Sequence, residues 1–378
     1  MKYPLFKVKI DTEDVLSRLR DVFNSGYLNE GTVVSEFRDR LCDILSHTMV
    51  LPTNSCTSAI SMALRLAGVG PGDDVVTTSM TCVATNTPIS FIGANVIWAD
   101  IDPATGNIDP ESVKDVITEK TKAVICVNWA GNPCMLDELQ AICDKNNAKL
   151  IQDSAHGFGS KYKGDHVCHH ADFTCYSFQA IKHITCGDGG ALVCKNKDDF
   201  VRARAMKWFG IDRNKAKDLK GEWKGQRWEV DIIEAGHKFH MNNISAAIGL
   251  SNLGSYEELV SKHIENAELY SRLFSTVSSI CPINVEPHSL SSSWVYTIVL
   301  DSKIDRDSLA KSLNDLGINA GLVHVPNHPY TCFKDSLSEL PNTERFSKTQ
   351  LSLPCGWWLD SENIMEIAGH VTRLCKEY

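Results

Sequence analysis

The chain has 378 residues, 43% of them hydrophobic and 22% charged, and its formal net charge at pH 7 is −9. This length permits a large buried core, and the composition is ordinary for a soluble globular protein. The negative charge argues against general binding to nucleic acids or anionic membranes, because both need a basic patch. No apolar stretch approaches the roughly 20 residues of a membrane span, and residues 1–9 lack the apolar core of a signal peptide. We therefore expect a cytoplasmic protein.

Two helices are predicted at the start of the chain. Apolar residues recur at helical spacing between residues 11 and 24 and between residues 34 and 45. The loop at 25–31 joins these helices and contains Asn29. No motif defines the shape of this loop, so its structure does not follow from the sequence.

A strand at 49–52 runs through small polar residues into a helix at 59–66. Such a junction aims backbone N–H groups and the helix dipole at one point, which makes it a ready anion site. Capping of the helix by Ser55 or Thr57 explains the same residues without a ligand. Both interpretations stay open at this point.

Strands alternate with helices from residue 49 to residue 153. This alternation predicts a mostly parallel sheet covered on both faces. Trp129 follows the strand at 123–127, where it would either line a site at the end of the sheet or belong to a turn. The further predicted elements are strands at 74–78, 95–99 and 149–153 and helices at 111–117 and 136–146, with a third helix that opens from residues 79–86 and runs to 92.

The strand at 149–153 ends in a carboxylate, Asp153. Ligands of open α/β sheets bind outside the carboxyl ends of the strands. A carboxylate in that position can pair with a pyridinium nitrogen, which pyridoxal 5′-phosphate (PLP) requires to act as an electron sink. His156 follows closely and is placed to contact the phenolic oxygen of such a ring.

Lys182 lies in the short connection between strands predicted at 173–178 and 191–194. Lysine is rarely buried without a partner, so an exposed loop lysine is the ordinary interpretation. A lysine held in a partly dry site loses its proton more easily, however, and can form a Schiff base with a carbonyl compound. Ser177, five positions earlier, offers a hydroxyl group to a phosphate.

The pattern around Lys182 closely resembles that of the DegT/StrS-type nucleotide-sugar aminotransferases, and the resemblance covers nearly the whole chain. It implies a fold-type I, PLP-dependent enzyme with an α/β fold. A large domain would contain a mostly parallel seven-stranded sheet covered by helices, followed by a small C-terminal α+β domain. The resemblance rests on the segments Asp153-Ser-Ala-His156, Ser177-Phe-x-x-x-Lys182 and Gly187-Asp-Gly-Gly190.

The resemblance also implies roles for individual residues. Lys182 would bind PLP and act as the catalytic residue, and Asp153 would keep the pyridine nitrogen protonated. The other expected cofactor contacts are His156, Ser177, Cys56, Thr57, Cys82 and Lys238. The expected substrate contacts are His183, Trp129 and Asn29.

Three of these positions depart from the family pattern. Cys56 stands where the phosphate-binding junction often has glycine, and Cys82 stands where an aromatic residue usually covers the cofactor ring. Lys238 replaces an asparagine that in many members reaches the PLP phosphate of the partner subunit. A lysine suits a phosphate, so the resemblance implies a homodimer with its active site at the subunit interface.

The C-terminal half is expected to complete the large domain (1–250) and to form the small one (251–378). A charged insertion near 208–231 would lie on the surface. The remaining predicted elements are helices at 197–206, 247–274, 306–316 and 361–377 and strands at 294–300 and 317–326, with 352–355 as a loop.

The cysteines favour neither disulfides nor a metal site. The chain has 14 of them, scattered mostly through apolar segments, and no C-x-x-C pair. Free cysteine behaves as a small buried hydrophobe, and cytosolic disulfides are rare. The cluster 168–170 (Cys-His-His) lacks a second pair at zinc spacing. We expect reduced cysteines and no metal.

The resemblance implies an aminotransferase that converts a keto group of a nucleotide-linked sugar to an amine. L-glutamate would be the donor, the cofactor would cycle between PLP and pyridoxamine phosphate, and the product would serve surface polysaccharide or related pathways. Two other enzymes stay open: a PLP-dependent sugar dehydratase, although those carry histidine at the position of Lys182, and an aminotransferase of small phosphorylated ketones. A sensor of PLP or sugar nucleotides is opposed by Lys182 and Asp153.

Overall fold

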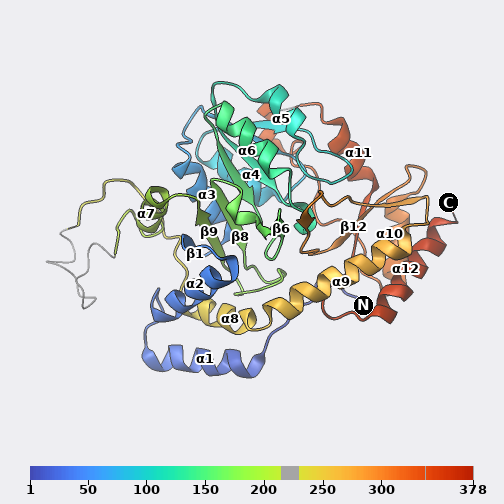
Figure 1. The fold of residues 1–378 in the computed structure, drawn as a ribbon, viewed down its shortest axis with the longest axis horizontal. Coiled ribbons are helices and arrows are strands. Elements are labelled where there is room, and N and C mark those ends of the chain that lie inside the picture. Colours follow the sequence, from blue (N-terminus) through green and yellow to red (C-terminus); the bar gives the residue numbers. More distant parts are fainter. Residues whose placement is uncertain (214–229, 337, 378) are drawn as a thin grey trace.

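A computed structural model describes residues 1–213, 230–336 and 338–377, and its centre is a seven-stranded sheet (Figure 1). Strand β9 runs antiparallel to both of its neighbours, β1 and β8. The five strands β8, β5, β4, β2 and β3 run parallel to one another. The predicted α/β fold with a mostly parallel sheet is therefore confirmed. In spatial order the strands are β1 (Val50–Thr53), β9 (Gly190–Cys194), β8 (Phe173–Ser177), β5 (Lys149–Asp153), β4 (Thr121–Val127), β2 (Asp74–Thr78) and β3 (Asn95–Ala99).

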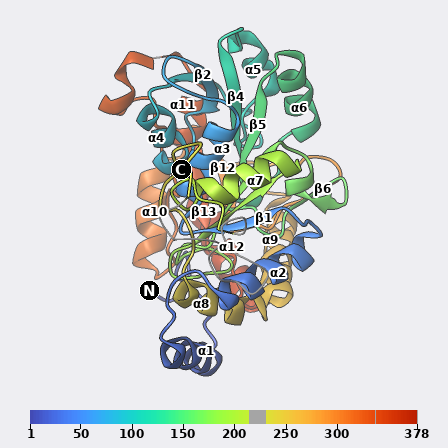
Figure 2. The ribbon, with the colours of Figure 1, turned by 90° about the vertical axis from the view of Figure 1, so that its left-hand side faces the viewer.

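Helices cover both faces of this sheet, as Figure 2 shows from the side. The central strands are almost wholly buried, as expected for a parallel sheet between two helical layers. One hydrophobic cluster joins the sheet to α3 (Cys56–Leu66), α4 (Val83–Phe91) and α7 (Lys197–Met206). A second cluster joins the other face to α2 (Thr32–Leu45), α5 (Pro110–Val116), α6 (Leu136–Lys145) and α8 (Asn243–Leu253).

A second, smaller sheet lies beside the C-terminal helices (Figure 1). Its antiparallel strands are β10 (Ile280–Pro282), β12 (Tyr296–Leu300) and β13 (Gln350–Leu353). They share one hydrophobic cluster with α9 (Tyr256–Phe274), α10 (Arg306–Asp315) and α12 (Ser361–Cys375). Tyr3 belongs to the same cluster, so the start of the chain packs on this unit. The domain boundary at residue 250 stays a prediction.

Three sequence expectations about elements were wrong. The single helix expected at 247–274 is two helices, α8 and α9, because Gly254 and Ser255 hydrogen-bond three residues back and end the first. The strand expected at 317–326 is irregular and makes only isolated bridges, at Ile318, Gly321 and Pro326, among the described residues. The segment at 350–353, part of which was expected to be a loop, instead forms β13 and pairs with β12.

The remaining described elements are short or peripheral. Figure 2 shows α1 (Thr12–Ser25) beyond α8 at one end of the molecule. Residues 214–229 of the charged insertion lie outside the described residues. No helix in the described part of the chain has the length and apolar character needed to cross a membrane; the cytoplasmic location stays a prediction. The other elements are β6 (Lys161–Tyr162), β7 (Asp165–His166), β11 (Ser289–Leu290), α11 (Pro341–Thr349) and the 3-10 helices η1 (Trp129–Gly131), η2 (Val167–His169) and η3 (Thr331–Ser336).

Candidate active site

A cavity of about 360 Å³ lies at the carboxyl ends of β4, β5 and β8, where ligands of such sheets bind. Its other walls come from the starts of α3 and α4 and from two segments near the small sheet, at 294 and 322–324. Most residues expected to bind the cofactor line this one cavity. They are Cys56, Thr57, Cys82, Asp153, His156, Ser177 and Lys182.

Lys182 is half-buried in the loop that joins β8 to β9. Burial lowers the pKa of its amine to about 8, and this effect outweighs the opposing attraction of Asp153. About a tenth of the amine is therefore uncharged at pH 7, far more than for an exposed lysine. The side chain has the basicity that a lysine nucleophile or proton carrier needs.

Asp153 is the last residue of β5 and is only 4% exposed. The Thr85 hydroxyl group donates a hydrogen bond of 2.6 Å to one carboxylate oxygen, and the Ala155 N–H group donates one of 3.0 Å to the other. Burial raises the pKa of this carboxyl group, although these hydrogen bonds oppose the rise. A buried carboxylate of this kind gains from a cationic partner in the cavity.

His156 belongs to a stack of rings on one wall of the cavity. Its ring lies 4.1 Å from that of Trp294, and its Nε2 atom lies 3.3 Å from Nε2 of His324. Burial holds the pKa of His156 well below its usual value and lowers that of His324 to about 3, so both rings are neutral. The Nδ1 atom of His156 is buried and has no hydrogen-bond partner within the part of the chain that the structure describes.

Sequence analysis did not identify Trp294 and His324 as site residues. Both were read as parts of strands, at 294–300 and 317–326. His324 reaches the cavity because its segment runs from a bridge with β13, at Gly321, to a bridge between Pro326 and Met80, just after β2 of the large sheet. No pattern in the sequence signals this crossing.

The first turn of α3 forms another wall of the cavity. Ser55 caps the helix by accepting a hydrogen bond of 3.0 Å from the N–H group of Ser58, so Thr57 is not needed as the cap. A Cβ atom on Gly190 would come within 2.5 Å of the Cys56 nitrogen, so glycine lets β9 pack closely on the start of this helix. Helix N–H groups, Thr57 and Ser177 together suit a phosphate.

Lys238 and Asn29 lie outside this cavity. They share a neighbouring hollow of about 390 Å³ with Asn54 and His240. The Nε2 atom of His240 lies 2.7 Å from the Asn29 side-chain oxygen. Lys238 is exposed, and its carbonyl group accepts a hydrogen bond from Asn54. Its ammonium group is therefore available to a ligand or partner on this surface.

His183 and Trp129 are packed inside the protein. His183 contacts the Ser292 carbonyl oxygen through Nε2 at 3.0 Å. Trp129 is 1% exposed, and its indole N–H group donates a hydrogen bond of 3.3 Å to Thr297. Neither lines the Lys182 cavity among its described residues. Their contacts give no support to the expected substrate binding, which stays a prediction.

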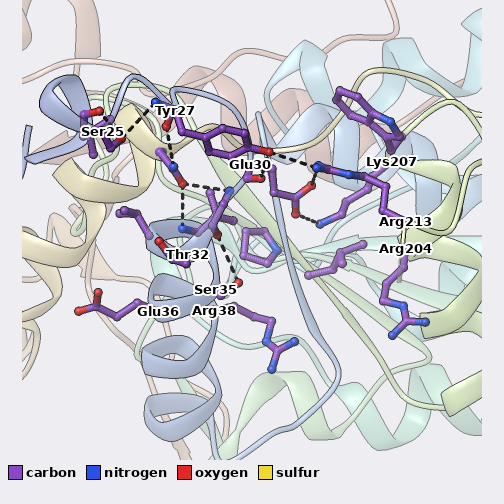
Figure 3. Close-up of a pocket in the computed structure, with 18 of the residues that line it drawn as sticks. Ser25, Tyr27, Glu30, Thr32, Ser35, Glu36, Arg38, Arg204, Lys207 and Arg213 are labelled. Atoms are coloured by element: carbon purple, nitrogen blue, oxygen red, sulfur yellow. Dashed lines mark hydrogen bonds and ion pairs between the residues drawn. The ribbon is translucent and has the colours of Figure 1, made fainter. Parts of the chain in front are cut away.

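A larger hollow of about 820 Å³ lies between α1, α2 and α7, close to the loop that carries Asn29 (Figure 3). Glu30 forms an ion pair with Lys207, which is only 8% exposed, and lies 3.8 Å from Arg213. On the other side of the loop, the Asn243 side chain accepts hydrogen bonds from the N–H groups of Gly31 and Val34. The loop is thus anchored from two directions.

Comparisons with known proteins show which family the chain and its fold resemble. A model of the DegT/DnrJ/EryC1/StrS aminotransferase family matches residues 9–372. The sugar aminotransferase CalS13 from Micromonospora echinospora superposes with a TM-score of 0.91 at 30% identity, covering 98% of this chain and 99% of that one. AtS13 from Actinomadura melliaura gives 0.91 at 34% identity, covering 98% of each chain. DesI, solved in the presence of its TDP-sugar product, gives 0.86 at 26% identity, covering 99% of this chain and 93% of that one.

Proposed function

Since this chain belongs to the DegT/DnrJ/EryC1/StrS family of PLP-dependent sugar aminotransferases, we propose that it converts a keto group of a nucleotide-linked deoxysugar to an amine. In this proposal L-glutamate is the amino donor. The product serves surface polysaccharide synthesis, such as that of a lipopolysaccharide O-antigen, or a related amino-sugar pathway. The observation that carries the proposal is that Lys182 and the buried Asp153 line the same cavity at the end of the sheet.

The residues of this cavity fit PLP. A buried carboxylate, a phosphate-binding helix start and an amine of lowered pKa are the groups that the cofactor's pyridine nitrogen, phosphate and aldehyde require. The unpaired Nδ1 atom of His156 offers a hydrogen bond to the phenolic oxygen. When bound, PLP supplies an electron sink for negative charge at the α-carbon of the donor.

Lys182 and Asp153 divide the catalytic work. Lys182 would hold the cofactor, and its amine would take a proton from the donor's α-carbon and return one to the acceptor sugar. Asp153 keeps the pyridine nitrogen protonated through its negative charge. The Thr85 hydrogen bond orients this carboxylate. Lys182 can move a proton in either direction because the pKa of its amine, about 8, is close to neutral pH.

The remaining cofactor contacts hold the phosphate and cover the ring. Thr57, Ser177 and the N–H groups at the start of α3, including that of Cys56, would bind the phosphate, and Cys82 would cover the ring. Lys238 of a second subunit completes the phosphate site, with Asn29 beside it contacting the substrate. The exposed position of Lys238, outside its own Lys182 cavity, supports a homodimeric site.

The nucleotide-linked acceptor is supported by the relatives. DesI was solved with a TDP-sugar product, and CalS13 is described as a sugar aminotransferase. The chain matches both over nearly its full length. The identity of the sugar and the position of amination depend on the loops around residues 25–31 and 208–230.

Visible absorption tests this proposal. The purified protein mixed with PLP is expected to develop a yellow band that Lys182→Ala lacks. Adding L-glutamate should bleach this band as the cofactor becomes pyridoxamine phosphate, and a keto sugar nucleotide should restore it.

Each other result contradicts a definite part of the proposal. A band that glutamate leaves unchanged would argue for a dehydratase or another donor. The same band in Lys182→Ala would show that another residue holds the cofactor. Restoration by small phosphorylated ketones but by no sugar nucleotide would reassign the acceptor, and the absence of any band would refute PLP binding.

A further inference from the structure

Trp294 connects several parts of the cavity wall and precedes β12 of the small sheet. Its indole N–H group donates a hydrogen bond of 3.0 Å to the carbonyl oxygen of Ile181, the residue before Lys182. The same side chain is only 2% exposed and stacks on His156 at 4.1 Å. The indole is therefore fixed against the loop that carries Lys182.

The Lys182 ammonium group lies directly over this indole. Its nitrogen atom is 3.7 Å from the ring centroid. No ion pair recorded for the described residues includes Lys182, and the Asp153 carboxylate receives its hydrogen bonds from other groups. A partly desolvated cation needs compensation, and the negative face of an indole supplies it in the strongest form that aromatic side chains offer.

We propose that Trp294 is a positioning residue for Lys182, holding the ammonium group on its indole face whenever the amine is not bonded to the cofactor. Release of the lysine during the proposed reaction leaves a four-carbon chain free to rotate. Contact with Trp294 keeps the amine in the cavity, beside the place where it must exchange protons. Because the indole stabilises the charged form, it also keeps the amine more basic than burial alone would allow.

The test measures the pKa of the Lys182 amine in the full chain purified free of PLP. Competitive labelling with acetic anhydride across a pH series, followed by peptide mass spectrometry, reports each lysine separately. Trp294→Leu keeps the site apolar but removes the π face, so the pKa should fall by about 0.5 to 1 unit. Labelling of Lys182 at pH 7 should then rise about three- to fivefold. Trp294→Phe keeps an aromatic face and should therefore lower the pKa of the Lys182 amine by less.

Lys149, ion-paired with Asp172 far from the indole, is the internal control and should titrate identically in all variants. An unchanged Lys182 pKa in Trp294→Leu, or a raised one, would overturn the proposal, since the indole would then only fill space or exclude water. If Trp294→Leu does not fold, Trp294→Met replaces it as a flexible apolar side chain. The inference rests on Lys182 being the reacting lysine, yet the labelling requires neither cofactor nor substrate, so its failure is distinct from failure of the proposed function.

Discussion

At the scale of single residues, the lowered pKa of Lys182 predicts how cofactor loading depends on pH. Only the uncharged amine can join an aldehyde, and burial lowers its pKa from 10.5 to about 8. The rate at which the protein free of cofactor develops its visible band with PLP should rise about tenfold per pH unit below 8 and level off above it. Stopped-flow absorbance between pH 6 and 10 measures this profile. A rate still rising steeply at pH 10 would mean that the amine has the pKa of an exposed lysine.

Asp153 provides a second prediction at this scale. Asp153→Asn keeps the shape of the side chain but removes the negative charge that we propose holds the pyridine nitrogen protonated. We expect transamination to fall roughly 100-fold or more, with little change in melting temperature. Asp172→Asn is the matched control, because Asp172 is also a buried carboxylate but is paired with Lys149 away from the cavity. That control should lose stability and retain activity; the reverse pattern would remove Asp153 from the mechanism.

At the scale of elements, the loop at 26–31 depends on the ion pair between Glu30 and Lys207 (Figure 3). Burial lowers the pKa of Lys207, and Glu30 opposes this shift. Glu30→Gln leaves a buried ammonium group near two other cations, Arg213 and Arg38, both of which also lower its pKa. We expect a loss of about 2 kcal/mol in the free energy of unfolding, measured by urea denaturation.

Two control variants distinguish the effect of the buried Glu30–Lys207 pair from that of an exposed ion pair. Glu30→Gln combined with Lys207→Met removes both charges and should recover most of the lost stability. Glu111→Gln breaks an exposed pair with Lys114 and should have no measurable effect. If Glu111→Gln lowers the free energy of unfolding as much as Glu30→Gln does, burial is not the reason that the Glu30 pair stabilises the protein.

The elements also show what the sequence could predict. Alternating apolar segments located most strands of the central sheet to within two residues, because buried parallel strands are continuous apolar runs. The sequence predicted Asp153 and Ser177 as site residues because they end such strands, and Lys182 because it lies in the short connection after one. Trp294 and His324 were missed because their roles depend on how a segment beside the small sheet crosses to the large one. Local sequence patterns do not predict packing between segments that are distant in the chain.

At the scale of the whole molecule, the cavity lies between the large sheet and the segments next to the small sheet. Its floor comes from strand ends of the large sheet, whereas Trp294 and His324 come from segments next to the small one. Lys238 lies in a neighbouring, separate hollow of the same chain. One chain thus presents most of the residues proposed to hold the cofactor in one cavity and, separately, an exposed lysine suited to a phosphate.

This separation predicts complementation between two inactive proteins. Lys182→Ala lacks the reacting amine, and Lys238→Ala lacks the group proposed to act in the partner's site. When the two are unfolded and refolded together in equal amounts, half of the dimers should be mixed, and each mixed dimer has one site with both lysines. Activity should return to about a quarter of the wild-type value, measured with glutamate and a keto sugar nucleotide. Lys182→Ala refolded together with the wild-type protein is the control that shows how efficiently mixed dimers form. If Lys238 serves its own subunit instead, no mixed dimer contains a complete site, and the mixture should be no more active than Lys238→Ala alone.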